Sequence, residues 1–257
     1  MIKDESDVIS RTLEHLAAQG VDRILLAENA SSDGTWEIVR DLQADGGLLP
    51  CVLEVIADPE IGYWQSRKMT ELAYLAALAG ARWIVPFDAD ELWSFGATTL
   101  REGFAEFNAS VPIIVEAGVH NHYRTPSDAG GHPFDTMRWR DPEPLTLPKV
   151  AFTADRRAGV HAGNHGVDLP DATRVLSAGL VVEHYPYRSP EQFLSKVRNG
   201  SAAYAATDLP RSTGQHWREY GELLAEHGAA GVREHYRAAF VVDDPTSRGL
   251  IYTDPDA

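Results

Sequence analysis

The sequence predicts an α/β protein with a mostly parallel sheet flanked by helices, followed by a β-rich region and a helical carboxyl-terminal region. The first observation is that helical and strand-like patterns alternate along the first third of the chain. The second is that polar and acidic segments directly follow the strand-like runs. Open α/β sheets bind their ligands at the carboxyl ends of the strands, so these segments indicate a binding edge.

The elements of the first third follow from periodicity. Residues 7–19 are expected to form a helix, because Ile9, Leu13 and Leu16 share one face, and Gly20 is placed to end it. The next expected elements are a strand at 22–28, a helix at 35–44, a strand at 51–57, a helix at 64–79 and a strand at 83–87.

The pattern changes at about residue 108, where short β-rich runs separated by Pro-, Gly- and Asp-rich stretches begin. Loops of this length are usually functional or mobile. Strands are expected at 111–116, 119–123, 149–153, 173–176 and 180–184. From about residue 189 the chain is expected to be helical through 204 and again over about 215–227, with an irregular tail after 243.

The most informative segment is the strand at 83–87, which leads directly into Asp88, Asp90 and Glu91. Clustered carboxylates repel each other unless a cation lies between them. Mg²⁺ or Mn²⁺ suits such a site, because these ions are typically held by one or two carboxylates together with substrate phosphates. A solvated acidic turn is the alternative explanation of the same residues.

A second motif, Asn-Ala-Ser-Ser-Asp-Gly-Thr at residues 29–35, lies between the strand at 22–28 and the helix at 35–44. Strand, polar loop and helix form the first half of a βαβ unit. The loop presents hydrogen-bonding groups at a helix amino terminus, beside the carboxyl end of a strand. An ordinary capped turn would have the same composition.

Together these two segments resemble family 2-type glycosyltransferases with the GT-A fold. Residues 29–35 resemble the family's N-x-S-x-D-G-T nucleotide loop, and residues 88–91 resemble its D-x-D metal motif in the DADE form. Residues 3–5, 61–65 and 184–193, the last continuing to Lys196 and Gly200, resemble further family segments in the same order. The resemblance covers about residues 2–204.

The resemblance implies a metal-dependent glycosyltransferase that uses Mn²⁺ or Mg²⁺. It would move a sugar from a nucleotide-sugar donor, most simply a UDP-sugar, to the hydroxyl of a carbohydrate, lipid-linked or natural-product acceptor; GDP and dTDP stay open. It also implies a single GT-A domain over residues 1–257. The nucleotide-sugar-binding half would span about 1–107, the acceptor-side half about 108–188 and the helical region about 189–257.

The resemblance also assigns roles to individual residues. Asp88, Asp90 and His184 are the expected metal ligands. The residues expected to hold the donor nucleotide are Asp4, Glu5, Asn29, Ser32, Asp33, Asp58, Arg188 and Lys196. If configuration inverts, a carboxylate must take the acceptor's proton. Glu91 is the first choice for this base because it adjoins the metal motif, and Glu116, Asp168 and Glu183 are alternatives.

Histidines outside the expected metal set cluster between residues 120 and 184. His165, in a Gly-Asn-His turn, is expected to hydrogen-bond acceptor or phosphate and is grouped with the catalytic residues. His120 and His122 are two residues apart on an expected strand and so share one face. For these two, a role as polar residues lining a cleft wall is at least as well supported as a functional role. A structural zinc site is not expected, because no cysteine is near.

The chain departs from the family at its beginning. The family normally has an apolar strand before the segment matched by residues 3–5, and only Met1 and Ile2 remain of it. That strand would lie in the middle of the sheet. Either the numbered chain starts at an internal methionine or the sheet tolerates the loss, and the sequence does not choose between these explanations.

Composition supports a soluble, cytoplasmic enzyme. The 257 residues are 44% hydrophobic, without a run long enough to span a membrane and without an apolar signal region at the amino terminus. The single cysteine, Cys51, suits a reducing compartment and is expected to be a buried small hydrophobe. The net charge of −15 argues against a nucleic-acid or anionic-membrane partner.

Three other functions are considered as alternatives to glycosyl transfer. A haloacid-dehalogenase-type phosphohydrolase also uses D-x-D after a strand, but it normally has Thr or Val where Leu92 stands. A nucleotidyltransferase would need a Gly-rich, basic phosphate loop near the amino terminus, which the sequence lacks. A non-catalytic relative that binds nucleotide-sugars or glycans would explain the missing first strand but not the retention of Asp33, Asp88 and Asp90.

Overall fold

The structure is a computed structural model that describes residues 1–128 and 130–253. The chain divides into two compact units, and each is described by itself. The first unit comprises Met1–Asp58, Trp64–His120 and Glu143–His184, and the second comprises Pro59–Tyr63, Asn121–Pro142 and Tyr185–Ala257. The single-domain organisation expected from the sequence stays a prediction.

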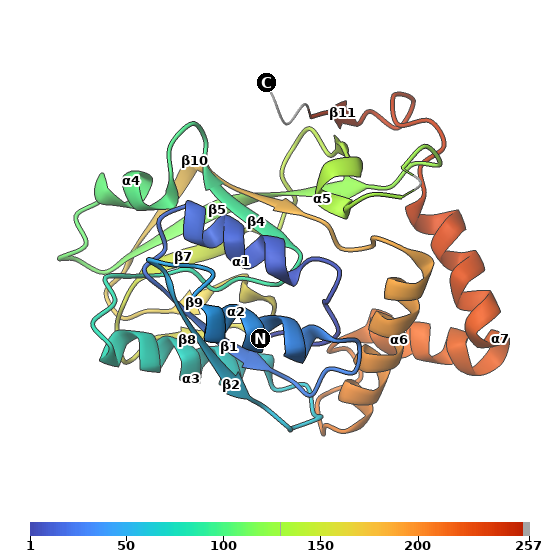
Figure 1. The fold of residues 1–257 in the computed structure, drawn as a ribbon, viewed down its shortest axis with the longest axis horizontal. Helices are drawn as coiled ribbons and strands as arrows, with labels where there is room; N and C mark the ends of the chain where they lie inside the picture. The colour runs from blue at the N-terminus through green and yellow to red at the C-terminus, as the bar shows by residue number, and fades with distance from the viewer. Residues whose placement is uncertain (129, 254–257) are drawn as a thin grey trace. The chain divides into compact units, whose positions relative to one another are not determined.

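The first unit contains the predicted alternation of helices and strands (Figure 1). Its first elements are α1 (Ile9–Ala18), β1 (Arg23–Glu28), α2 (Thr35–Asp45), β2 (Val52–Ala57), α3 (Gln65–Leu78) and β3 (Trp83–Ile84). They continue with β4 (Glu91–Phe95), α4 (Leu100–Ala105), β5 (Ile113–Tyr123), β7 (Lys149–Thr153), β8 (Gly159–Val160), the 3-10 helix η1 (Ala162–Asn164), β9 (Val167–Asp168) and β10 (Thr173–His184). The last three residues of β5 belong to the second unit.

Helix α1 illustrates how closely the local sequence determines its element. Ile9, Leu13 and Leu16 are buried on one face, as their spacing predicts. Gly20 follows the helix with a φ of +81°, a left-handed conformation that favours glycine and turns the chain toward β1. The helix therefore begins and ends within two residues of its predicted limits.

The α/β class is confirmed, but the strands form split and mixed sheets instead of a mostly parallel one. β1 and β2 pair in parallel as a two-stranded sheet of their own. The β4–β10, β3–β7 and β5–β7 ladders of the larger sheet are antiparallel. The prediction failed here because the runs after residue 108 carry a strand pattern, and a strand pattern alone does not give direction.

The strand predicted at 83–87 is shorter than expected. Only Trp83 and Ile84 form a ladder, with Phe152 and Thr153 of β7 on one edge. Within the described residues no strand pairs with the other edge, so residues 85–87 have no ladder to join. Residues that the sequence divided into pairs of short strands instead form the continuous strands β5 and β10.

The core of the first unit consists of two clusters. One includes the fully buried side chains of Leu13, Leu26 and Trp93, and the other includes Phe152 with Val150. Neighbouring residues of β1 contribute to different clusters, because successive side chains of a strand point to opposite faces. The strand β1 is therefore covered on both faces, as a central strand would be.

The second unit is mainly helical. Its elements are the end of β5, α5 (Pro133–Thr136), β6 (Trp139–Arg140), α6 (Pro190–Ala205), α7 (Gln215–Phe240) and β11 (Ile251–Tyr252). Helices α6 and α7 pack together around Phe193, Val197 and Tyr236 (Figure 1). Helix α7 was predicted to stop at residue 227, where Gly228 leaves helical geometry with a φ of +62°, but the helix resumes beyond this kink.

Candidate active site

The predicted metal motif lies in the turn between β3 and β4. Glu91 begins β4, and its N–H donates to the Asp88 carbonyl at 3.2 Å. β4 pairs with β10 in a register that sets His184 opposite Glu91. This pairing brings His184 Nε2 to 3.7 Å from Asp90 Oδ1. The sheet thus brings together two of the three predicted metal ligands, which are far apart in the sequence.

A cation that the sequence analysis missed lies within the motif. Lys149, the first residue of β7, is buried, and its Nζ is 2.6 Å from both Asp88 Oδ2 and Glu91 Oε1. The sequence did contain a hint of this ion pair. Lys149 begins the apolar strand Lys-Val-Ala-Phe-Thr, and a lysine in such a strand is rarely buried without an acidic partner.

The other oxygen of Asp88 is held by two side-chain amides. Asn164 Nδ2 donates to Asp88 Oδ1 at 3.1 Å, and Gln65 Nε2 does so at 3.4 Å. Gln65 also accepts the Gly163 N–H at 2.7 Å, which fastens the loop carrying η1 to the start of α3. Asp88 is therefore fixed from α3, β7 and the η1 loop at once.

The two carboxylates beside Lys149 differ in their pKa values. Burial alone would raise the pKa of Asp88, but the Lys149 ammonium outweighs burial and the pKa is lowered. Burial raises the pKa of Glu91 to about 7 despite the same ammonium group. The pKa of Lys149 lies above its usual value, because the attraction of both carboxylates exceeds the effect of its own burial. Lys149 and Asp88 are therefore charged at neutral pH, and Glu91 titrates near it.

Glu91 is oriented toward the protein interior. Its side chain is 0% exposed, and Oε2 accepts hydrogen bonds from the Asp88 N–H at 3.1 Å and from the Trp93 indole at 3.0 Å. A general base has to reach a proton of the acceptor. This environment favours a positioning role for Glu91 over the catalytic role expected from its place in the sequence.

The arrangement suits a divalent cation only in part. Within the part of the chain that the structure describes, no group of three or more His, Cys, Asp or Glu side chains is arranged to hold a metal. Asp90 and His184 form a pair with one carboxylate and one imidazole donor, which is enough where substrate phosphates complete the coordination. Asp88, the third predicted ligand, pairs with Lys149 instead.

The predicted nucleotide loop is joined to the segment that precedes α1. Ser32 N–H donates to Asp4 Oδ1 at 2.6 Å, and Asp4 N–H donates to Ser31 Oγ at 2.9 Å. Lys3 Nζ donates to the Asn29 carbonyl at 2.6 Å. Two segments that the sequence indicated independently therefore form one hydrogen-bonded structure.

Asp33 and Thr35 hold the far end of this loop. Asp33 accepts the Ser6 N–H at 3.0 Å and the Thr35 hydroxyl at 2.6 Å, while Glu5 N–H donates to that hydroxyl at 2.9 Å. Burial opposes ionisation of Asp33, but these hydrogen bonds outweigh it and lower its pKa. Its carboxylate is therefore ionised and rigidly oriented.

The carboxyl end of β2 contributes a third polar group. Asn29 Nδ2 donates to the Asp58 carbonyl at 2.9 Å and to Asp58 Oδ2 at 3.1 Å. Lys68 of α3 forms an ion pair with the same carboxylate, and both side chains are largely buried. The carboxyl ends of β1 and β2 are thereby tied together, as expected for adjacent parallel strands.

His165 lies next to Asn164 in the loop that contacts Asp88. Its Nδ1 is 2.9 Å from the Pro148 carbonyl, so Nδ1 carries the hydrogen and the neutral ring leaves Nε2 as an acceptor. The side chain is exposed overall, but partial desolvation of the ring by its neighbours lowers the pKa of His165, so the imidazole is neutral at pH 7. The ring packs over Gly163, where an added Cβ would come within 2.5 Å of His165 Cδ2.

Arg188 and Lys196 belong to the second unit. The Arg188 guanidinium donates to the Tyr185 carbonyl at 3.0 Å, and Lys196 Nζ donates to the Pro186 carbonyl at 3.2 Å. These contacts organise the turn that leads into α6. Their expected role in binding the donor diphosphate stays a prediction.

The sequence profile described as Glycosyl transferase family 2 matches residues 2–152. The matched region contains the loop at 29–35, the acidic motif and Lys149, and it covers more than half of the chain. The chain therefore belongs to glycosyl transferase family 2 and is a glycosyltransferase. A comparison with curated proteins found no match. Among the described residues, no helix has the length and apolar character needed to cross a membrane.

Proposed function

We propose that this glycosyltransferase uses a nucleotide-sugar donor, most simply a UDP-sugar, and transfers the sugar to an acceptor hydroxyl. The observation that carries the proposal is the pairing of Asp90 with His184 in the same unit as the hydrogen-bonded loop at 29–35. The Thr12 hydroxyl of α1 donates to the Ala89 carbonyl at 2.6 Å, so the helix that follows the loop-bonded residues 3–6 contacts the acidic motif directly.

Asp90 and His184 would hold Mn²⁺ or Mg²⁺, which when bound would neutralise negative charge growing on the leaving diphosphate. The nucleoside would lie against residues 3–6 and 29–35, with Asp33 and Asp58 as hydrogen-bond acceptors. Both carboxylates are already fixed by neighbouring groups, so little side-chain freedom is lost when the donor binds.

Lys149 is the residue that makes the acidic motif compatible with a doubly charged donor. It compensates Asp88 and Glu91 inside the protein and leaves Asp90 as the carboxylate that faces His184. Without this cation, three acids within four residues would repel both each other and the donor phosphates.

We assign the proton acceptor to His165 in place of Glu91. Its neutral ring has Nε2 as an acceptor, and it lies near the motif because the preceding residue, Asn164, donates to Asp88 at 3.1 Å. The Pro148 carbonyl would stabilise the imidazolium formed when Nε2 takes the acceptor's proton. An inverting reaction needs a base on the acceptor side, and His165 would supply it in place of the carboxylate expected from the sequence.

Calorimetric titration of UDP, GDP, dTDP and CDP, each with Mn²⁺ and with EDTA, tests the proposal. We expect one nucleotide, UDP first, to bind only with the metal. Asp90→Asn should lose this metal-dependent binding, whereas the matched exposed change Asp45→Asn should keep it. Absence of binding to all four nucleotides, in protein with a cooperative unfolding transition, would contradict the donor class.

A further inference from the structure

A cavity of about 380 Å³ lies in the first unit between β5, β9 and the beginning of β10. The apolar residues that form its base are buried: Ile114, Val167 and Leu169. The charged residues of its lining are exposed: Arg157, Asp168 and Arg174. Pockets of roughly 300–1,000 Å³ that combine an apolar part with a few polar groups are the usual sites for small ligands.

The two arginines of the cavity are held in place by carboxylates. Arg157 donates from Nε and Nη2 to the two oxygens of Asp155, at 3.0 and 2.6 Å. Arg174 Nη1 donates to Glu116 Oε1 at 2.8 Å. A guanidinium group carries five N–H donors, so each arginine has further donors to offer a ligand. Because both side chains are already positioned, a ligand would restrict them little further.

Asp168 gives the cavity a hydrogen-bond acceptor. One of its oxygens, Oδ1, is 3.0 Å from His161 Nε2, and its side chain is 84% exposed, which leaves the carboxylate open to a ligand. A hydroxyl group donates one hydrogen bond and accepts others. Donors on two arginines beside an acceptor on Asp168 therefore suit a ligand that carries several hydroxyl groups.

The charges around the cavity disfavour an anionic ligand. The guanidinium groups of Arg157 and Arg174 contribute two positive charges, and the carboxylates of Asp155, Glu116 and Asp168 contribute three negative ones. A phosphate or a carboxylate would have to compete with these carboxylates for the arginines and would be repelled by them. An uncharged polyol can form hydrogen bonds while both ion pairs stay intact.

The β8–β9 hairpin connects this cavity to the acidic motif. The two strands pair with each other, and the loop between them carries Asn164 and His165. Asn164 donates to Asp88 at 3.1 Å. Asp168 is three residues from His165, and a stretch of that length spans at most about 11 Å. A chain of sugars held in the cavity is therefore close enough to reach His165.

We propose that this cavity binds an uncharged sugar unit of the acceptor, so that the acceptor is an uncharged glycan or glycoside. Arg157 and Arg174 would donate to hydroxyl oxygens of the sugar, Asp168 would accept from a hydroxyl, and the apolar base would lie against the C–H groups of the ring. The term acceptor rests on the transferase function proposed above, whereas the choice of an uncharged sugar rests on the cavity alone.

Nuclear magnetic resonance titration of the full chain, without nucleotide or metal, tests the proposal. The uncharged probes are the methyl glycosides of glucose, galactose, mannose and N-acetylglucosamine, and the charged probes are glucose 6-phosphate and glucuronic acid. We expect at least one glycoside to shift the amide signals of Asp168, Leu169 and Arg174, with a Kd of about 1–10 mM for a single small ring. Both charged probes should bind at least about 10-fold more weakly.

Three variants locate the binding. Arg157→Gln removes charged donors and should weaken glycoside binding about 10-fold. Arg156→Gln is the matched control, because Arg156 is an exposed neighbour outside the cavity lining, and its affinity should equal that of the wild type. Ala172→Trp fills the cavity from its lining and should abolish the shifts in protein that keeps the wild-type Tm.

The proposal is overturned if none of the glycosides shifts these amide signals, or if a charged probe binds as tightly as the best glycoside. Unchanged glycoside binding in Ala172→Trp would also overturn it. Its failure is distinct from that of the donor proposal. Nucleotide binding without glycoside binding contradicts the sugar site alone, whereas glycoside binding without nucleotide binding contradicts the donor class alone.

Discussion

Replacing Lys149 by methionine removes the cation that lies between two carboxylates of the acidic motif. Lys149 Nζ is 2.6 Å from Asp88 and from Glu91, and the Lys149 and Glu91 side chains are 5% and 0% exposed. Removing one partner of a buried ion pair costs about 3–5 kcal/mol, because the other charge stays buried without compensation. We expect the free energy of unfolding of Lys149→Met to fall by about that amount at pH 8.

The pH dependence of this loss distinguishes an electrostatic cause from poor packing. Burial already raises the pKa of Glu91 to about 7 in the presence of Lys149, and loss of Lys149 raises it further. Glu91 therefore takes up a proton as the pH falls, and the uncompensated charge disappears. The destabilisation should be smaller at pH 6 than at pH 8. Lys149→Met with Glu91→Gln should recover part of it at pH 8, because Asp88 keeps its charge.

Urea unfolding followed by circular dichroism at both pH values measures these differences, with equal m-values as the condition for comparing them. Arg23→Met is the control, because its ion pair with Glu54 is about half exposed and is worth less than about 1 kcal/mol. The electrostatic explanation is wrong if Lys149→Met lowers the free energy of unfolding at pH 8 no more than Arg23→Met does. It is also wrong if adding Glu91→Gln to Lys149→Met restores no stability.

Four further changes test the site. Glu91→Gln removes a group whose folded pKa of about 7 exceeds its ordinary 4.5, so wild-type stability relative to this variant should fall by about 3 kcal/mol as pH rises from 4.5 to 8, measured by urea unfolding. His165→Gln should lower turnover by about 10²–10⁴-fold without changing donor affinity, measured by initial rates and calorimetry. Asp90→Asn should weaken nucleotide binding in Mn²⁺ at least about 10-fold, measured by calorimetry, while its unfolding transition stays that of the wild type. His184→Ala should weaken Mn²⁺-dependent binding while the far-ultraviolet circular dichroism stays that of the wild type.

For each of these four changes, a specific result would contradict the prediction. A wild-type and Glu91→Gln stability difference that is constant with pH would mean that Glu91 does not titrate in the folded protein. Unchanged turnover in His165→Gln would remove it as the base. Unchanged affinity of Asp90→Asn in Mn²⁺ would remove it as a ligand, and unfolding of His184→Ala would assign His184 a structural role.

The first third of the fold was predictable because its signals are local. The spacing of Ile9, Leu13 and Leu16 sets α1, and the glycine after it sets the turn. The strand at 83–87 was overestimated for a nonlocal reason, since a strand needs partners and residues 85–87 have none among the described residues. The antiparallel ladders were not predictable, because strand patterns do not specify direction.

The site was predictable where a motif holds its residues close in sequence. Asp88, Asp90 and the loop at 29–35 were proposed in this way, and the β4–β10 register brings His184 Nε2 to 3.7 Å from Asp90 Oδ1. Their roles in binding metal and nucleotide stay predictions. Lys149 and Asn164 were missed because their contacts with Asp88 depend on the tertiary fold. Glu91 was chosen for its position alone, which carries no information about its burial.

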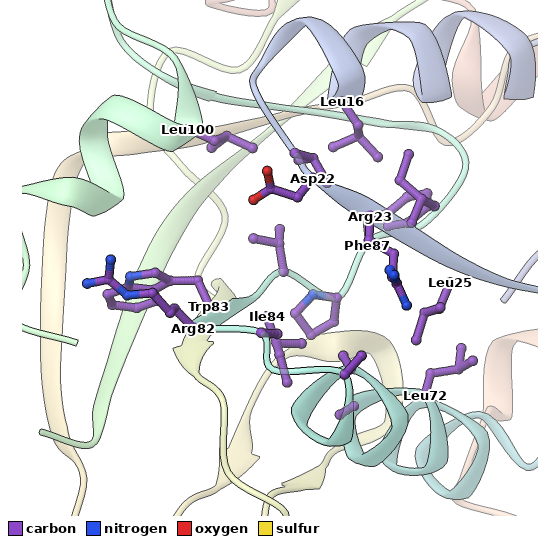
Figure 2. Close-up of a pocket in the computed structure, with 18 of the residues that line it drawn as sticks. Leu16, Asp22, Arg23, Leu25, Leu72, Arg82, Trp83, Ile84, Phe87 and Leu100 are labelled. Atoms are coloured by element: carbon purple, nitrogen blue, oxygen red, sulfur yellow. The ribbon is translucent and has the colours of Figure 1, made fainter. Parts of the chain in front are cut away.

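A cavity of about 720 Å³ lies between β1 and residues 82–87 (Figure 2). These two segments lead directly to Asn29 and to Asp88, and along the cavity their side chains lack the close contacts of a packed core. The spacing between the loop at 29–35 and the acidic motif therefore depends on individual hydrogen bonds more than on packing. One of these is the bond from the Thr12 hydroxyl to the Ala89 carbonyl at 2.6 Å, which joins α1 to the motif.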